Sequence, residues 1–263
     1  MKWLKRICLE VWSKVKRPFG KRKMAIEETI NAWFDGTDVQ ISDKINSSSP
    51  TDRLCDAVLH SAKDYCFAIL LLLQKGHSMP AMALLRCLYE LSMKLFWCLS
   101  VPGKTDNKEV DKIVEQKIRR WEKDTLCSVM KYLKELKNTA DKPNVDYIEQ
   151  EINRLKKELL SSDPTVKCLP PFANLVGELP DLIRKELHPR LYLKFNNAVH
   201  LDVKSLVENY KSKSSGRSVS DLNALIKCCV ILVLYINWAV RKNYDVDVNG
   251  IKQEYHAVME TLQ

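Results

Sequence analysis

The sequence predicts an all-α protein, an antiparallel helical bundle with a basic amphipathic helix at its N-terminus. Its 263 residues include only seven glycines and ten prolines, and no run of alternating β-branched residues is present. Leu, Lys, Glu, Ala and Met, all good helix formers, dominate the long segments. Propensity and periodicity therefore indicate the same fold class. We expect a single helical domain over residues 24–263, preceded by an arm over residues 1–23.

The predicted arm carries most of the excess charge of the chain. Residues 1–23 hold nine lysines and arginines and one glutamate, so eight of the nine excess positive charges lie there. Up to Arg17 the apolar residues share one side of a short helix that Pro18 and Gly20 end. Such a helix could lie on an anionic membrane face or dock on the bundle, and the alternative is a frayed basic tail. The rest of the chain is near neutral, which argues against a body that holds a nucleic-acid backbone everywhere.

Helix caps, turn residues and apolar spacing predict the remaining helices in chain order. They cover residues 25–34, 52–74, 78–99, 106–139, 144–161, 220–242 and 249–262. Loops are expected at DGTD, residues 35–38, and at the SSSP run, where Ser49 caps the next helix and Pro50 opens it. The helices over 52–74 and 78–99 should form an antiparallel hairpin at the centre of the core.

The helices within residues 106–161 are highly charged and only thinly apolar. We expect an outer helical hairpin whose solvated face carries the charge. A crossing punctuated by prolines follows, from Pro164 to Pro189, with one or two short helices.

The last strong helix, over residues 220–242, is unbroken in its apolar character from Cys228 to Ile236. A membrane span needs about 20 predominantly apolar residues. Lys227 and Asn237 bracket this run too closely, so we expect a buried core helix.

The cysteines and the known cofactor motifs point to no metal and no cofactor. The nine cysteines contain no CxxC pair and no Cys/His cluster with zinc spacing. Most lie among Leu, Val and Phe, where a thiol acts as a small hydrophobe. Reduced thiols in a cytosolic protein are the plain interpretation. The P-loop, GxGxxG, GxSxG and HExxH motifs are absent.

Two polar constellations interrupt apolar helical segments. Arg86 and Glu90 lie four residues apart in ALLRCLYELSMKLFW. Tyr192, Asn196 and His200 have the same spacing in RLYLKFNNAVHLDV. Residues four apart share a helix face, so each set forms a polar stripe. Burying either stripe without polar partners would cost free energy, and each stripe can supply the partners of the other. We therefore expect the two stripes to face one another at the functional site.

These residues are suited to proton transfer beside a phosphate. His200 can take and return a proton near neutral pH, and Lys194 or Arg86 can stabilise a developing oxyanion. That is the minimum equipment for metal-free cleavage of RNA, in which the 2′-hydroxyl is the nucleophile. Glu90 and Asn196 would orient these groups. A buried polar network that fixes helix register, or a small-ligand pocket, would use the same residues.

The other histidines carry no comparable signal. His60 and His77 have no evident partners in the sequence, and His188 and His256 have the pattern of surface residues.

The LLRCLYE helix and the later Tyr/Asn/His stripe resemble an uncharacterised bacterial all-helical family whose members share LLRxxxE and YxxxSxxxH segments. That family is similar in layout to the HEPN helical-bundle superfamily, many of whose members are RNases of toxin, CRISPR and phage-defence systems with an Arg-x4–6-His motif. The likeness covers roughly residues 53–242. Lys194 stands where a HEPN nuclease has arginine, whose bidentate fork lysine lacks, and Asn196 stands where the family usually has serine. The resemblance implies a homodimer with the site built across its two-fold axis.

Two functions are therefore expected. The first is a metal-independent endoribonuclease or toxin-type effector, in bacterial defence, with RNA as its substrate. The second is a non-catalytic interaction or sensor module that the basic arm tethers to an anionic membrane or an acidic partner. Either would be cytoplasmic, with peripheral contact at the inner membrane face where the arm binds lipid.

Overall fold

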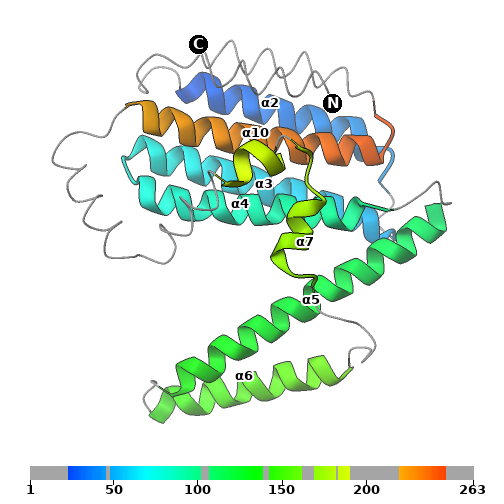
Figure 1. Cartoon of the computed structure of the whole chain (residues 1–263), viewed down its shortest axis with the longest axis vertical. Helices are drawn as coiled ribbons and strands as arrows, with labels where there is room; N and C mark the ends of the chain where they lie inside the picture. The colour runs from blue at the N-terminus through cyan, green and yellow to red at the C-terminus, as the bar shows by residue number, and fades with distance from the viewer. Residues whose placement is uncertain are drawn as a thin grey trace. The chain divides into compact units, whose positions relative to one another are not determined.

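The computed structural model describes residues 23–45, 48–101, 107–138, 142–161, 169–181, 183–189 and 219–246. Throughout these ranges the regular elements are helices, and the fold class is all-α (Figure 1). The chain divides into two compact units, one formed by residues 1–99 with 176–263 and one by residues 100–175. That residues 24–263 form one domain stays a prediction. The arm up to residue 22 and the predicted helix at 249–262 lie outside the described residues.

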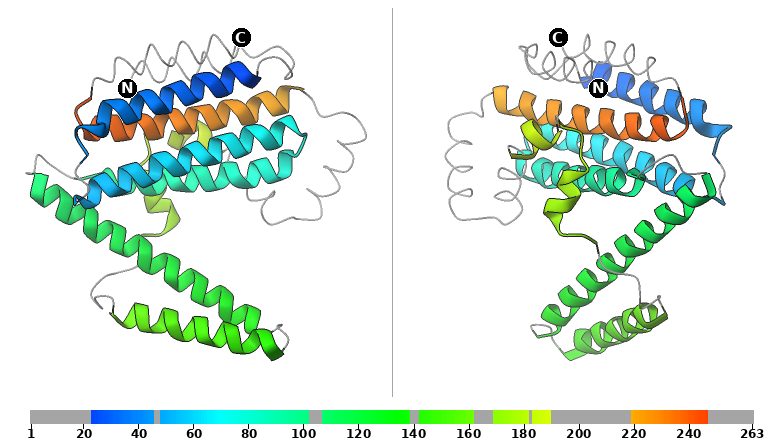
Figure 2. Two further views of the ribbon diagram at one scale, coloured as in Figure 1. Left: turned by 180° about the vertical axis from the view of Figure 1, so that it is seen from behind. Right: turned by 45° about the vertical axis from the view of Figure 1, so that its right-hand side comes forward.

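In the described part of the first unit, four long helices lie alongside one another as a bundle (Figures 1 and 2). They are α2 (Lys23–Ser42), α3 (Pro50–Gln74), α4 (Ser78–Leu99) and α10 (Val219–Asn243). Helix α10 packs on both α3 and α4, and α2 packs on α3 and α10. The α3–α4 hairpin therefore lies at the centre of the core, as predicted.

Local signals set the boundaries of the α3–α4 hairpin. The backbone N–H of Asp52 donates to the Ser49 hydroxyl at 3.3 Å, and Pro50 occupies the first turn of α3. This confirms the predicted N-cap. Gly76 adopts a positive φ of 76° in the turn between the helices, a conformation that glycine reaches without steric cost.

The loop predicted at residues 35–38 is wrong, because these residues belong to helix α2. The helix continues through this DGTD segment and ends at Ser42. Its buried residues recur at helical spacing on both sides of the segment: Ile30, Phe34, Thr37 and Ile41. Their burial outweighs the roughly 1 kcal/mol by which glycine disfavours a helix interior. Tertiary packing thus overrides the local turn signal.

Helix α10 is the core helix that the sequence predicts. From Ile226 to Arg241 every residue except Trp238 is buried. Among the described residues one stretch, Ala224–Asn243, is long and apolar enough to cross a membrane, with a mean hydropathy of 1.8. In the structure 83% of its most apolar window is buried against protein, so the stretch is weak evidence for a span.

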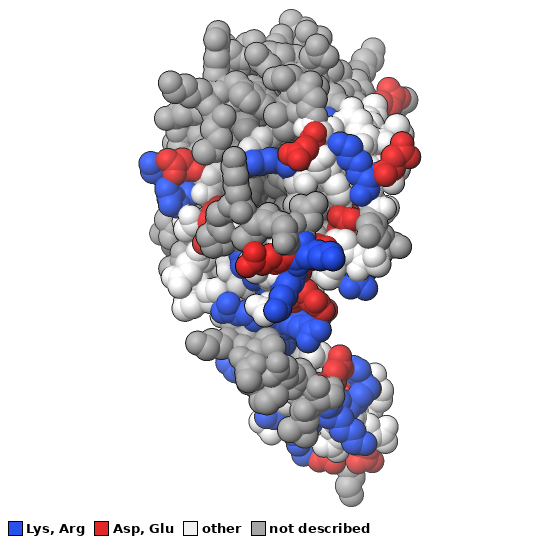
Figure 3. Space-filling view, turned by 90° about the vertical axis from the view of Figure 1, so that its right-hand side faces the viewer, with Lys and Arg blue, Asp and Glu red and all other residues white. Residues whose placement is uncertain are grey.

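The second unit contains the predicted helical hairpin. It consists of α5 (Asn107–Lys137) and α6 (Lys142–Ser161), which pack against each other as antiparallel helices (Figure 2). Helix α6 buries Ile148, Ile152 and Leu155 on one face. The remaining surface carries both signs of charge, and basic and acidic side chains interleave on the face drawn in Figure 3.

The crossing after α6 contains two short helices within residues 169–181 and 183–189, as expected. They are α7 (Phe172–Gly177) and the single π-helical turn η1 (Ile183–Leu187). Two apolar side chains of this crossing, Leu179 and Ile183, are buried in the first unit. The crossing thereby brings His188, which directly follows η1, to Tyr89 of α4 in the bundle.

Candidate functional site

Arg86 and Glu90 form the predicted pair on α4. The Nε of Arg86 donates to Oε1 of Glu90 at 2.8 Å. The side chains are 19% and 35% exposed, although Leu85 and Leu88 beside them are fully buried. The pair therefore lies at the edge of the core, where water lowers the desolvation cost and a solute can reach it.

A second polar pair lies on the same helix turn. Tyr89 of α4 is buried, and its Oη lies 2.5 Å from Nδ1 of His188. The two rings stack with their centroids 5.9 Å apart and their planes inclined by 30°. His188 is half-buried, which corrects the expectation that it is a surface residue. His60 also has a partner, since its Nδ1 lies 3.0 Å from the Asp56 carbonyl oxygen.

Burial keeps both members of the Tyr89–His188 pair uncharged at neutral pH. Desolvation raises the pKa of the Tyr89 phenol and lowers the pKa of the His188 imidazole. Two neutral arrangements satisfy the hydrogen bond: the phenol donates to Nδ1, or an Nδ1–H donates to the phenol oxygen. Arg86 lowers and Glu90 raises the pKa of Tyr89, so the two pairs are electrostatically one site.

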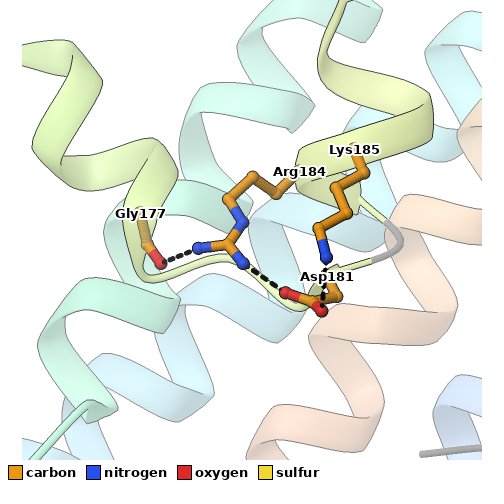
Figure 4. Close-up of polar contacts among 4 residues, drawn as sticks. All are labelled: Gly177, Asp181, Arg184 and Lys185. Atoms are coloured by element: carbon orange, nitrogen blue, oxygen red, sulfur yellow. Dashed lines mark hydrogen bonds and ion pairs between the residues drawn. The ribbon is translucent and has the colours of Figure 1, made fainter.

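A cluster of polar contacts in the crossing, centred on Asp181, precedes His188 in the chain (Figure 4). The Asp181 carboxylate accepts hydrogen bonds from Arg184 and from Nζ of Lys185, the latter at 3.0 Å. Arg184 also reaches back to the carbonyl oxygen of Gly177 at 3.4 Å. The Lys185 hydrogen bond is the largest influence that lowers the pKa of Asp181. These contacts tie α7 to η1 and define the path of the chain toward His188.

The other predicted site residues are Tyr192, Lys194, Asn196 and His200, which lie outside the described residues. The meeting of the two polar stripes therefore stays a prediction. Sequence reasoning missed Tyr89 and His188 because 99 residues separate them. The only available signal was the position of Tyr89 between Arg86 and Glu90 in an apolar helix.

A separate polar cluster joins α2, α3 and α10. Tyr244 donates its hydroxyl to Oδ1 of Asp52 at 2.7 Å, and Lys44 donates to the Tyr244 carbonyl oxygen at 2.9 Å. Burial raises the pKa of Tyr244, and it raises the pKa of Cys55 to about 12. Within the described ranges no three His, Cys, Asp or Glu side chains are grouped to hold a metal ion.

The fold and the site define a helical-bundle protein with a partly exposed Arg/Glu pair beside a Tyr/His pair. Residues 62–218 match the family described as "Family of unknown function (DUF5677)", and the chain belongs to that family. This confirms the expected membership of an uncharacterised helical family. Both described pairs and the predicted 192–200 stripe fall within the matched residues. No curated protein and no solved structure matches the chain.

Proposed function

We propose that this protein is a metal-independent endoribonuclease, or a toxin-type effector with the same chemistry, that acts in bacterial defence. The observation that carries the proposal is the Tyr89–His188 hydrogen bond beside the Arg86–Glu90 pair. It combines a neutral imidazole, a phenol that holds the imidazole through a hydrogen bond, and a guanidinium on the same helix as the phenol. Those are the groups that RNA cleavage without a metal requires.

His188 is suited to the role of general base. When Nδ1–H donates to the Tyr89 oxygen, Nε2 is the unprotonated nitrogen and can accept the proton of the RNA 2′-hydroxyl. The 2′-oxygen then attacks phosphorus, and the bond from phosphorus to the 5′-oxygen breaks. The 5′-oxygen leaves with a proton from His200. The products are a 2′,3′-cyclic phosphate and a 5′-hydroxyl.

The charged residues have supporting roles. Arg86 and Lys194 would stabilise the negative charge that grows on the phosphate oxygens in the transition state. Glu90 orients Arg86 through its 2.8 Å ion pair. Asn196 and Tyr192 would orient the substrate and His200.

The test is incubation of the purified full-length protein with total RNA in EDTA. We expect discrete cleavage, and RNA with 2′-O-methyl groups should resist it because the nucleophile is blocked. His188→Gln and His200→Ala should abolish cleavage at unchanged thermal stability. His77→Ala changes an exposed histidine of the same unit and should cleave like the wild type. Absence of cleavage by the wild-type protein would overturn the proposal.

A second candidate function is a non-catalytic interaction or sensor module. The favouring observation is that each polar pair forms a hydrogen bond within the chain. In this proposal the pairs fix helix register, and the arm at residues 1–23 tethers a cytoplasmic protein to the anionic inner face of the membrane. The full-length protein should then co-sediment with anionic vesicles, and glutamine in place of the arm's lysines and arginines should abolish co-sedimentation. Equal partition of both proteins would exclude the tether.

A further inference from the structure

Exposed apolar side chains gather on the α5–α6 hairpin. Among the described residues six large hydrophobic side chains are exposed, and four of them belong to this hairpin. Their exposed fractions are 42% for Val129, 61% for Tyr132, 37% for Leu136 and 65% for Tyr147. A concentration of this kind on one small unit is typical of an interaction surface.

Three of these residues belong to one stripe along α5. Trp121, Thr125, Val129, Tyr132 and Leu136 are spaced by four, four, three and four residues, so they line one helix face. We call these five residues the α5 stripe. The stripe is distinct from the less exposed line formed by Leu126, Met130 and Leu133. A stripe with this spacing fits against another helix of similar pattern.

The charges beside the stripe are self-complementary. Asp124 and Lys131 are seven residues apart, so both flank the α5 stripe on the same side. If a second α5 runs antiparallel, with a two-fold axis near Ser128 and Val129, Asp124 of each copy lies beside Lys131 of the other. An axis between Ser128 and Val129 sets Trp121 beside Leu136 of the second copy and Thr125 beside Tyr132. The charged pair centres one residue earlier, between Cys127 and Ser128, so the apolar and charged positions place the two-fold axis within about 1.5 Å of each other along the helix.

We propose that the α5 stripe is a homodimer interface, in which two copies of this chain pack their α5 helices antiparallel about a two-fold axis near Ser128. The occupant of the exposed face is thus a second copy of the protein. The contact from residue 121 to 136 is about 22 Å long at 1.5 Å per residue. Such a contact is smaller than a standard stable interface, so we expect a dissociation constant of about micromolar order. The inference is independent of the proposed ribonuclease activity.

The experiment is sedimentation equilibrium of the full-length protein from about 1 to 100 μM. The wild-type protein should pass from monomer to dimer over this range. Tyr132→Glu should leave a monomer because it places charge in the centre of the apolar contact. The matched control is Leu71→Glu, which alters a side chain 49% exposed on α3 and should dimerise like the wild type. Circular dichroism checks that the helix content of each variant is unchanged.

A charge exchange tests the register. Asp124→Lys alone and Lys131→Asp alone each create two like-charge pairs across the axis and should weaken dimerisation by about tenfold. The double variant restores both pairs with reversed sign and should dimerise like the wild type. A wild-type protein that stays monomeric at 100 μM would overturn the proposal. So would dimerisation that Tyr132→Glu leaves unchanged, or a double variant as weak as the single variants.

Discussion

Arg241 of α10 donates two hydrogen bonds to one oxygen, the hydroxyl of Thr37 on α2. Nε and Nη2 of Arg241 lie 3.0 and 2.6 Å from Thr37 Oγ1, and both residues are fully buried. The contact joins positions 204 residues apart in sequence. It also lies within the DGTD segment that the sequence alone marks as a loop. A buried guanidinium requires an acceptor, and a helical α2 supplies one.

Thr37→Val should therefore destabilise the protein. Valine has nearly the same shape but removes the acceptor of two buried N–H groups, so we expect a loss of roughly 1–3 kcal/mol in the free energy of unfolding. Urea denaturation followed by circular dichroism measures this loss. Thr37→Ser retains the oxygen and is the control. A valine variant as stable as the wild type would show that other acceptors suffice for Arg241.

His188 should make stability depend on pH. Burial lowers its pKa in the folded protein, so the unfolded chain binds a proton first as the pH falls. The free energy of unfolding should therefore decrease below about pH 6.5, the ordinary pKa of histidine. Urea denaturation between pH 5 and 8 should show this decrease in the wild type and a smaller decrease in His188→Gln.

His60 provides a control, because its pKa is shifted in the opposite direction from that of His188. Its pKa is raised, chiefly by the hydrogen bond to the Asp56 backbone, so its contribution is present at low pH and is lost as the pH rises through the raised pKa. His60→Gln should remove stability at pH 5 and have little effect at pH 8. Equal pH slopes for the His60 and His188 variants would contradict both assignments.

The Ser49 cap should contribute measurably to α3. Ser49→Ala removes the acceptor for the Asp52 N–H and should cost about 1 kcal/mol of stability. Ser49→Asn supplies a side-chain oxygen at the same place and should retain most of the stability. Thermal unfolding of the three proteins compares them directly. Loss of equal size in both variants would mean that the capping bond is not the cause.

Thiol reactivity should follow burial. Cys87 is the exposed cysteine among those that the structure describes. Cys66 and Cys229 are fully buried with their sulfur atoms 3.6 Å apart, and the hydrogen bond between them is the largest influence that raises the pKa of Cys229. Because the thiolate is the reactive form, N-ethylmaleimide should modify Cys87 in the native protein and Cys229 only after denaturation. Mass spectrometry of the modified peptides measures the order, and rapid native modification of Cys229 would contradict it.

Helix boundaries and local pairs could be predicted from the sequence because they depend on residues a few positions apart. The Ser49 cap, the α3–α4 hairpin and the Arg86–Glu90 pair are of this kind, since a helix bonds each N–H to a carbonyl four residues away. The charged hairpin and the buried α10 follow from the density and spacing of their apolar residues. The family was also recognisable from the helical segment that contains Arg86 and Glu90.

Only the tertiary structure decided which distant side chains meet. Tyr89 contacts His188, and Thr37 contacts Arg241, because of how the helices pack. No short-range sequence pattern predicts this packing. The same packing makes α2 helical through a segment whose local propensity favours a turn. The physical reason is that burial and hydrogen-bond satisfaction are summed over the whole core, so a distant partner can outweigh the roughly 1 kcal/mol of a local preference.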